Sequence, residues 1–219
     1  MRQKTFRSIL RFILPKIAKI ELIGVEKIPQ EQYIIASNHL GRLDSSLLYY
    51  VFDREDIILP TAEKYKNHPI YGRLGKAMGA IWLNRFDADI HSMKEILRRL
   101  KAGGLLAIAP EGTRSKVEAL QEGKPGVAYL ACKVNIPVIP IAITGTEDRL
   151  VKENLKHFRR SHIIVRAGNP FRLPPIDNKE REASLRIATD EIMCQIAAML
   201  PEKYRGVYAK HPRLQELLK

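Results

Sequence analysis

The sequence predicts an α/β fold, with a largely parallel central sheet flanked by helices and an N-terminal amphipathic helical arm. Three observations lead to this prediction. Short apolar segments alternate along the chain with longer segments of helical periodicity. The connections between them are short and carry turn signals such as Gly103-Gly104 and Pro174-Pro175. The composition of the 219 residues, 45% hydrophobic and 28% charged, excludes a disordered or disulfide-scaffolded chain.

The first twenty residues predict a basic amphipathic helix. Apolar side chains recur at steps of three and four from Phe6 to Ile20 and form one stripe. Six Lys and Arg residues, and no acidic residue, accompany them. Pro15 lacks an amide hydrogen, so we expect the helix to kink or split near Leu14. Such a helix is typical of membrane-surface binding, and the alternative is a helix docked on its own domain.

Strand-like and helix-like segments alternate through the rest of the chain. The predicted strands cover 21–25, 33–37, 56–59, 80–84, 105–109, 138–143 and 163–167. The predicted helices cover 45–52, 70–78, 89–101, 123–133 and 179–200. No internal repeat or interdomain linker interrupts this order. We therefore expect an arm, residues 1–20, followed by one domain, residues 21–219.

The net charge of +13, from 37 Lys and Arg against 24 Asp and Glu, is concentrated in two places. Residues 1–20 and 152–172 together supply eleven of the thirteen charges. A basic balance implies an anionic partner, which is a nucleic acid, a membrane surface or a phosphorylated substrate. Aromatic residues are only 7% and no nucleic-acid-binding motif occurs, so we expect no nucleic-acid partner.

The sequence shows neither a membrane span nor an export signal. The longest uninterrupted apolar segments, such as 105–109 and 138–143, are far shorter than the roughly 20 residues that a spanning helix needs. No secretory signal pattern occurs at the N-terminus. We therefore expect a protein on the cytosolic side, where Cys132 and Cys194 remain reduced and packed. Their spacing matches no metal motif, so we expect no metal site.

A first polar cluster, NHLGRLD, follows the predicted strand 33–37. His39 lies at the end of that strand, and Asp44 has the position of a helix N-cap. Gly41 lets the loop turn tightly, so that the His and Asp side chains can meet. A carboxylate bonded to one imidazole nitrogen leaves the other nitrogen as a base. The alternative is a histidine beside a helix that Asp44 merely caps.

A second polar cluster, PEGTRS, follows the predicted strand 105–109. Gly112 permits close backbone approach, and Thr113 offers a hydroxyl. Arg114 presents a planar guanidinium that suits a phosphate. The alternative is a polar turn in which Arg114 pairs with Glu111 or with another carboxylate. Because functional groups gather where strands of such sheets end, the two clusters together indicate a catalytic site.

These blocks resemble those of the glycerolipid acyltransferases that use an H-x4-D motif, notably the 1-acylglycerol-3-phosphate acyltransferases. His39 and Asp44 match the H-x4-D block, and PEGTRS matches the third block. GAIWLNR, residues 79–85, resembles the second block, usually written G-x-I-x-I-D-R. IPVIPIAI, residues 136–143, matches the fourth block, which contains proline. All four occur in the family's order.

The second block departs from the family at one position. Asn84 stands where the family usually has Asp, while Arg85, associated with phosphate binding, is retained. A lysine between the first two blocks often contacts the acceptor phosphate in this family. Lys64 is the best match for it, and Lys66 is the alternative.

The resemblance implies an O-acyltransferase domain over residues 21–219. It would move an acyl group from acyl-CoA or acyl carrier protein to the hydroxyl of a lysophospholipid, with no cofactor. His39 would be the general base, and Asp44 would orient it. Glu111 and Gly112 would help to build the acceptor site. Arg114 would bind the acceptor phosphate.

Arg85 and Lys64 would hold the same phosphate, with Thr113 beside them. Because the acceptor lives in a bilayer, the resemblance also implies a peripheral enzyme on the cytoplasmic face of a membrane, anchored by residues 1–20. Two alternatives remain within this family: a different acceptor, such as glycerol 3-phosphate or another lysolipid, and a catalytically dead scaffold. A non-catalytic basic protein that binds lipid or nucleic acid is the alternative outside it.

Overall fold

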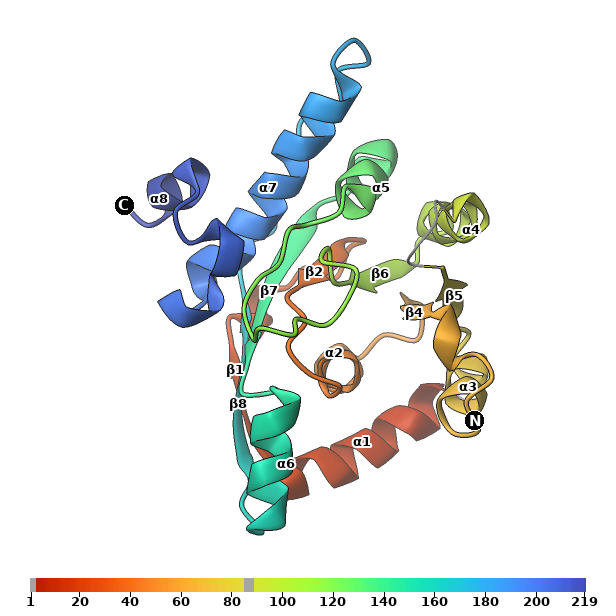
Figure 1. Cartoon of the computed structure of the whole chain (residues 1–219). Coiled ribbons are helices and arrows are strands. Elements are labelled where there is room, and N and C mark those ends of the chain that lie inside the picture. The colour runs from red at the N-terminus through yellow and green to blue at the C-terminus, as the bar shows by residue number, and fades with distance from the viewer. Residues whose placement is uncertain (1–2, 85–88) are drawn as a thin grey trace.

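The computed structural model describes residues 3–84 and 89–219, and it has the predicted α/β architecture around a six-stranded sheet (Figure 1). The strand order is β1-β8-β7-β2-β6-β3. The strands are β1 (Ala18–Ile23), β2 (Ile34–Ser37), β3 (Ile57–Ile58), β6 (Leu105–Ile108), β7 (Val138–Thr144) and β8 (Ser161–Ala167). Two further strands, β4 (Pro60–Ala62) and β5 (Ile81–Leu83), form a small parallel sheet of their own.

The central sheet is largely parallel, as predicted. β2 pairs in parallel with both β6 and β7, and β1 pairs in parallel with β8. The exception is the antiparallel pair of β7 and β8, in which Thr144 lies opposite Ile164. Because β2 and β6 run side by side in the same direction, their carboxyl ends lie at one edge of the sheet.

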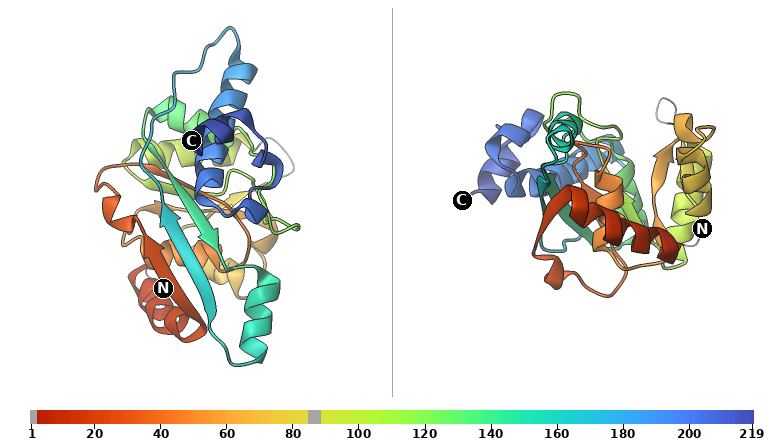
Figure 2. Two further views of the ribbon diagram at one scale, coloured as in Figure 1. Left: turned by 90° about the vertical axis from the view of Figure 1, so that its left-hand side faces the viewer. Right: turned by 90° about the horizontal axis from the view of Figure 1, so that it is seen from below.

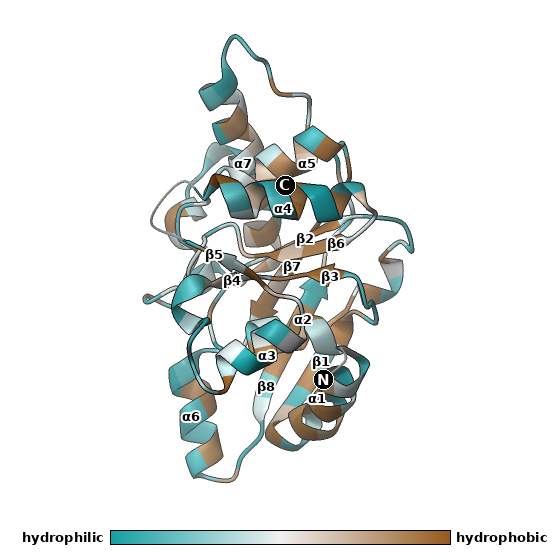
Figure 3. Ribbon diagram, turned by 90° about the vertical axis from the view of Figure 1, so that its right-hand side faces the viewer, coloured by the Kyte–Doolittle hydropathy of each residue, from teal (hydrophilic) through white to brown (hydrophobic). Residues whose placement is uncertain are grey.

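Helices cover both faces of the sheet. One face packs against α4 (Ile90–Lys101), α5 (Gly126–Val134), α7 (Arg181–Met199) and α8 (Pro212–Leu217). The other face packs against α1 (Gln3–Ile17) and α2 (Asp44–Val51). Strand β2 shows why: Ile34 and Ala36 point to the first layer, and Ile35 points to the second. In Figure 3 the central strands β2, β6 and β7 are therefore mostly apolar, whereas the helices contain both polar and apolar residues.

The sequence missed several short elements. They are β4, α6 (Asp148–Lys156), α8 and the single-turn 3-10 helices η1 (Val25–Lys27), η2 (Glu63–Tyr65), η3 (Glu202–Tyr204) and η4 (Gly206–Tyr208). α6 contains no buried residue and is mostly polar, so it has few of the apolar residues on which the other helix predictions depend. Among the helices that the sequence predicts, α3 (Tyr71–Ala77) lies close to its predicted range. α7 begins two residues later than predicted.

The N-terminal arm differs from its prediction. α1 continues through Pro15 and ends at Ile17, and the next three residues belong to β1 rather than to the arm. Its buried face consists of Phe6, Leu10 and Leu14, which pack with α2, so the predicted stripe is rotated. The alternative that this helix packs on its own domain is therefore confirmed for one of its faces. Among the described residues, no helix is both long and apolar enough to cross a bilayer.

Arg7 fastens α1 to the domain. Its side chain is buried, and it donates to the backbone oxygens of Tyr49 and Arg54 and to the carboxylate of Asp53 at 2.7 Å. Those acceptors lie at the end of α2 and just after it. A buried arginine with this many partners fixes the angle at which α1 crosses α2.

We predict that Arg7→Ala lowers the free energy of unfolding by about 2 kcal/mol, because it leaves buried carbonyl groups without a donor. Urea unfolding followed by circular dichroism measures this change. Lys4→Ala is the matched control, since Lys4 pairs with Glu55 where both side chains are exposed. Its effect should stay within about 0.5 kcal/mol. Equal effects of the two substitutions would contradict the role of Arg7.

Candidate active site

The two polar clusters meet at the carboxyl edge of β2 and β6. The backbone N–H of His39 donates to Oε1 of Glu111 at 2.9 Å. In return, the N–H of Ser115 donates to the carbonyl oxygen of His39 at 2.8 Å. The parallel pairing of the two strands brings these loops together, as the sequence predicted.

His39 and Asp44 form a hydrogen-bonded pair. His39 Nδ1 lies 2.7 Å from Asp44 Oδ2, and the carboxylate is buried. The same oxygen accepts from the N–H groups of Leu40 at 2.8 Å and Gly41 at 2.9 Å. The prediction that Asp44 caps α2 is wrong: the side chain makes no capping bond and turns back into the His39 loop. Two backbone donors therefore orient the carboxylate toward the imidazole.

Asn38 and Gly41 position this loop on its neighbours. The Asn38 side chain donates to the carbonyl oxygen of Ile143 at 2.8 Å and accepts from its N–H at 2.7 Å, so it extends the β2–β7 pairing by one step. A Cβ on Gly41 would lie 1.6 Å from the backbone oxygen of Thr146. Gly41 is thus required for close approach of two backbones, rather than for the tight turn that we expected.

Glu111 is buried beneath His39 and does not pair with Arg114. Its Oε2 accepts from the N–H of Gln121 at 3.0 Å, while Oε1 accepts from His39. Burial raises the pKa of Glu111 to about 7, although the two backbone donors act in the opposite direction. The carboxyl group therefore links the two clusters and is the most strongly perturbed acid at the site.

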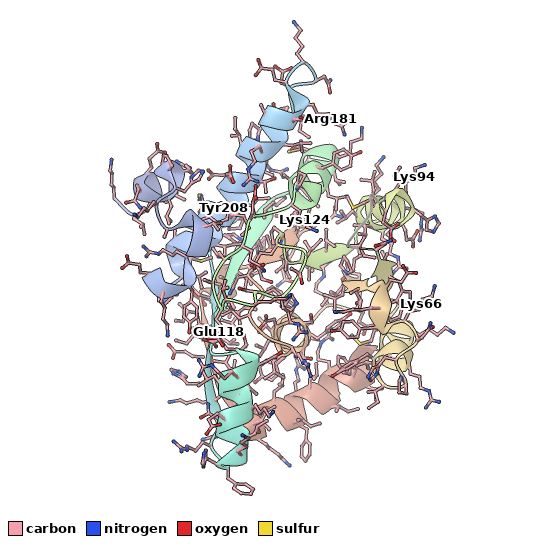
Figure 4. All side chains as sticks on the ribbon, viewed as in Figure 1. Lys66, Lys94, Glu118, Lys124, Arg181 and Tyr208 are labelled. Carbon is pink, nitrogen blue, oxygen red and sulfur yellow. The ribbon has the colours of Figure 1, made fainter. Side chains whose placement is uncertain are left out.

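Gly112 has a left-handed backbone, with φ of 71°. This conformation, rather than close approach, is what its position requires. The Lys124 side chain covers it, with Cδ 3.1 Å from the position that a Cβ would take. Figure 4 shows Lys124 in the centre of the molecule, on the loop that precedes α5. Lys124 was not predicted as a site residue, because it lies outside the four sequence motifs.

Arg114 and Arg42 converge on one carboxylate. Arg114 Nη1 lies 2.5 Å from Asp148 Oδ2, and Arg42 Nε lies 3.4 Å from the same oxygen. The N–H of Arg42 also donates to Asp148 Oδ1 at 2.8 Å. Thr113, between the buried Glu111 and this group, is exposed. Asp148, the first residue of α6, was not predicted, since nothing in one sequence connects it to a motif so distant along the chain.

A cavity of about 70 Å³ opens beside His39. Polar residues of its lining are His39, Asp44 and the two serines Ser37 and Ser45. Apart from Gly112, the other lining residues are apolar: Leu48, Leu59, Pro60, Leu83, Ala107, Ile108 and Ala109. Asp44 Oδ1 is buried and accepts no hydrogen bond from any described residue. The pair thus lies at the boundary between a polar rim and an apolar pocket.

The remaining predicted residues lie elsewhere or outside the described ranges. Lys64 is exposed on η2, with its ammonium group 5.2 Å from the ring centroid of Tyr65, and it does not line the His39 cavity. Lys66 and Asn84 line a separate, larger cavity of about 660 Å³. Arg85 lies outside the described residues. Within residues 3–84 and 89–219, no group of His, Cys, Asp or Glu side chains is arranged to hold a metal ion.

The C-terminal segment supports the site from behind, a role that the sequence did not reveal. The N–H of Leu120 donates to the carbonyl oxygen of Tyr204 at 2.9 Å, and the Tyr208 hydroxyl accepts from the N–H of Gly123 at 3.0 Å. These bonds hold the segment that carries Gln121 and Lys124. Figure 4 shows Tyr208 close to that segment.

Comparisons with known proteins give a family and a fold. The sequence model of the family described as Acyltransferase matches residues 19–144, more than half of the chain. A crystal structure of the 1-acyl-sn-glycerophosphate (LPA) acyltransferase PlsC from Thermotoga maritima has a similar fold. Its TM-score is 0.65 at 18% identity, and the match covers 87% of this chain and 78% of that one.

Curated relatives come from bacteria, plants and fungi. A probable 1-acyl-sn-glycerol-3-phosphate acyltransferase of Mycoplasma pneumoniae is 23% identical over 77% of this chain and 68% of its own length. The 1-acyl-sn-glycerol-3-phosphate acyltransferase of Cocos nucifera is 29% identical over 81% of this chain, and that of Saccharomyces cerevisiae is 29% identical over 69%. The matches span 56% and 51% of those two proteins.

We predict that Glu111 titrates near pH 7. Carbon-13 NMR of glutamate-labelled protein should show one carboxyl group with a pKa of about 7 that disappears in Glu111→Gln. Glu95 is the internal control, because its exposed bonds to Arg98 and Arg99 lower its pKa to about 2.

The same titration affects stability. Since the pKa rises from 4.5 to about 7 on folding, Glu111 favours the folded state most at low pH. That contribution falls by about 3 kcal/mol as the pH rises through this window. A Glu111 that titrates near pH 4.5 would contradict its burial beneath His39.

Proposed function

The chain belongs to the acyltransferase family, and we propose that it transfers a fatty acyl group to the free hydroxyl of 1-acylglycerol 3-phosphate, which gives phosphatidate. The acyl donor is a thioester, acyl-CoA or acyl carrier protein. The observation that carries this proposal is the His39–Asp44 pair, set between a rim with two arginines and an apolar cavity. The names of the relatives support the choice of acceptor.

We base the proposed proton transfers on the geometry of the pair. We assign the Nδ1–H tautomer to His39, because the Asp44 carboxylate 2.7 Å away is an acceptor for that hydrogen, and the lone pair then lies on Nε2. Nε2 takes the proton of the acceptor hydroxyl while the hydroxyl oxygen attacks the thioester carbonyl carbon. When the tetrahedral intermediate collapses, the carbon–sulfur bond breaks and the thiolate takes the proton from His39. The proton that His39 takes from the acceptor hydroxyl thus ends on the released thiol, and His39 returns to its starting state.

The apolar side of the cavity receives one end of the acyl group. Leu48, Leu59 and Leu83 line it within the same pocket as His39. At about 70 Å³ the cavity is far smaller than the roughly 300 Å³ or more of sites that enclose a whole ligand. We therefore assign it to the carbonyl end of the acyl group, next to the base. Such positioning converts an encounter of two substrates into a reaction at one site.

The polar rim receives the acceptor phosphate. Arg114, two residues after Gly112 of the cavity lining, pairs with Asp148, and a phosphate group would compete with that carboxylate. We assign further contacts with the phosphate to Arg85 and Lys64 on the strength of the family resemblance, together with Thr113 and Gly112 of the same loop. The buried Glu111 shapes this acceptor site by joining its two loops.

We place the enzyme peripherally at the cytoplasmic face of a membrane, because its proposed acceptor and product both reside in a bilayer. The outer face of α1 supports this assignment, since it exposes Ile9, Phe12 and Ile13. Residues 1–20 then contribute to anchoring, although one side of α1 packs on the domain.

We predict that His39→Ala lowers kcat by about 10²–10⁴-fold, because it removes the general base. The measurement offers a panel of lysophospholipids and glycerol 3-phosphate with each thioester donor and identifies products by mass spectrometry. His91→Ala, an exposed histidine on α4, is the matched control and should keep full activity. Undiminished transfer by His39→Ala would refute the mechanism, and glycerol 3-phosphate as the preferred acceptor would refute the substrate.

We predict that Arg114→Ala lowers kcat/KM for the acceptor by about 10²-fold, since a charge-assisted hydrogen bond to the phosphate is lost. The KM for the donor should stay constant. Asp148→Asn should lower the acceptor KM instead, because the phosphate no longer displaces a carboxylate from Arg114. If Arg114→Ala leaves both acceptor parameters unchanged, the phosphate does not bind there.

A further inference from the structure

The two basic stretches of the sequence meet at one end of the molecule. β1 pairs with β8 so that Ala18 lies opposite Ser161. The end of α1 therefore lies beside the turn 157–160, which connects α6 to β8. Arg160 Nη1 lies 3.5 Å from the carbonyl oxygen of Pro15. Figures 1 and 2 show α1 and α6 at this same end of the sheet.

The turn 157–160 presents a phenylalanine to solvent. The Phe158 side chain is 100% exposed, and its backbone is left-handed, with φ of 53°. The turn is nevertheless well bonded, since the N–H groups of Phe158 and Arg159 donate to the carbonyl oxygens of Leu155 and Asn154 at 3.1 and 2.8 Å. A hydrated aromatic ring and a left-handed non-glycine residue are both unfavourable. The left-handed backbone ends α6, but the hydrated ring contributes nothing to packing within the chain, so the ring points to an external partner.

The outer face of α1 offers a second apolar contact nearby. Phe12 is 66% exposed, and Ile9 and Ile13 are also exposed. Lys16 lies one turn after Phe12, with Nζ 3.6 Å from the ring centroid. An aromatic ring beside a flexible cation suits a surface where acyl chains meet charged headgroups.

Some cations at this end of the molecule have no carboxylate partner among the described residues, whereas those at the start of α1 form ion pairs. Lys4, Arg7 and Arg11 pair with Glu55 or Asp53. By contrast, Lys16, Arg159 and Arg160 form no ion pair with any residue in the described ranges. The basic character of α1 in the sequence is thus partly used for docking, and the uncompensated charge collects around Phe12 and Phe158.

We propose that Phe12, Ile13, Lys16 and Phe158–Arg160 form one docking surface for a bilayer that contains anionic lipid. The two rings enter the headgroup region, and the three cations contact lipid phosphates. α6 runs from Asp148 at the candidate site to this turn, a rise of about 13 Å. A docked bilayer therefore lies within one short helix of the acceptor rim. The inference deepens the proposed function, from which it takes the choice of a membrane as partner.

The test measures binding of the full-length protein to vesicles of phosphatidylcholine with phosphatidylglycerol, without acceptor or donor. Phe158→Ala should weaken partitioning by about tenfold. Arg159→Ala with Arg160→Ala should weaken it by about fivefold for each charge removed. The controls are Ile187→Ala, an exposed apolar residue on α7, and Lys94→Ala with Lys133→Ala, exposed cations on α4 and α5. Figure 4 shows Lys94 far from α6, and the controls should bind like the wild type.

A spectroscopic arm reports insertion directly. In a Trp82→Phe background, Phe158→Trp makes residue 158 the only tryptophan, since the chain contains one. Its emission should shift to the blue with anionic vesicles and should be quenched by brominated lipids.

Unchanged partitioning of Phe158→Ala, or equal losses in the controls, would overturn the proposal. Normal vesicle binding with impaired transfer from acyl carrier protein would overturn it too and would assign the surface to that protein. Transfer with detergent-dispersed acceptor should survive all these variants, so failure of this proposal and failure of the proposed function are distinguishable.

Discussion

The site depends on one oxygen atom, Oδ2 of Asp44, which accepts three hydrogen bonds. The donors are the His39 imidazole and the backbone N–H groups of Leu40 and Gly41. All three lie within the same loop, so the carboxylate closes that loop on itself and orients the ring at once. The loop can close only because Gly41 approaches the backbone of Thr146, which a side chain would prevent. The parallel strands then bring Glu111 beneath the loop. Its carboxyl group accepts from the His39 N–H and so holds His39 at the carboxyl edge of the sheet.

Two regions of this molecule differ in how their charged side chains are paired. Around the His39–Asp44 pair the charges are local and have partners: Arg114 and Arg42 share Asp148, and Glu111 is held between two backbone donors. At the far end of α6, Lys16, Arg159 and Arg160 stand beside exposed aromatic rings without an ion pair in the described part of the chain. The net charge of +13 for the whole chain therefore does not show how charge is arranged in either region. α6 connects the two, so one helix relates the proposed acceptor site to the proposed membrane surface.

Much of the fold was predictable, because strands such as 105–109 and helices such as 89–101 have strong periodicity and clear turn signals. The meeting of His39 with Asp44 was predictable too, since both belong to one short loop. Asp148 was not, because its contact with Arg114 depends on the register of distant strands. The roles of Gly41 and Gly112 were exchanged for a similar reason: a sequence shows that glycine is present, but not whether a left-handed backbone or a neighbouring chain requires it. The burial of one face of α1 depends on Arg7 and its acceptors near the end of α2, which no local pattern reveals.

The central claim is that His39 and Asp44 act as one unit. A double-substitution cycle in kcat/KM tests it most directly, with Asp44→Asn, His39→Ala and the two combined. If Asp44 acts only by orienting and stabilising the imidazole, the combined variant should be no slower than His39→Ala alone. If the two losses multiply, each residue contributes independently, and the hydrogen-bonded pair does not act as one catalytic unit.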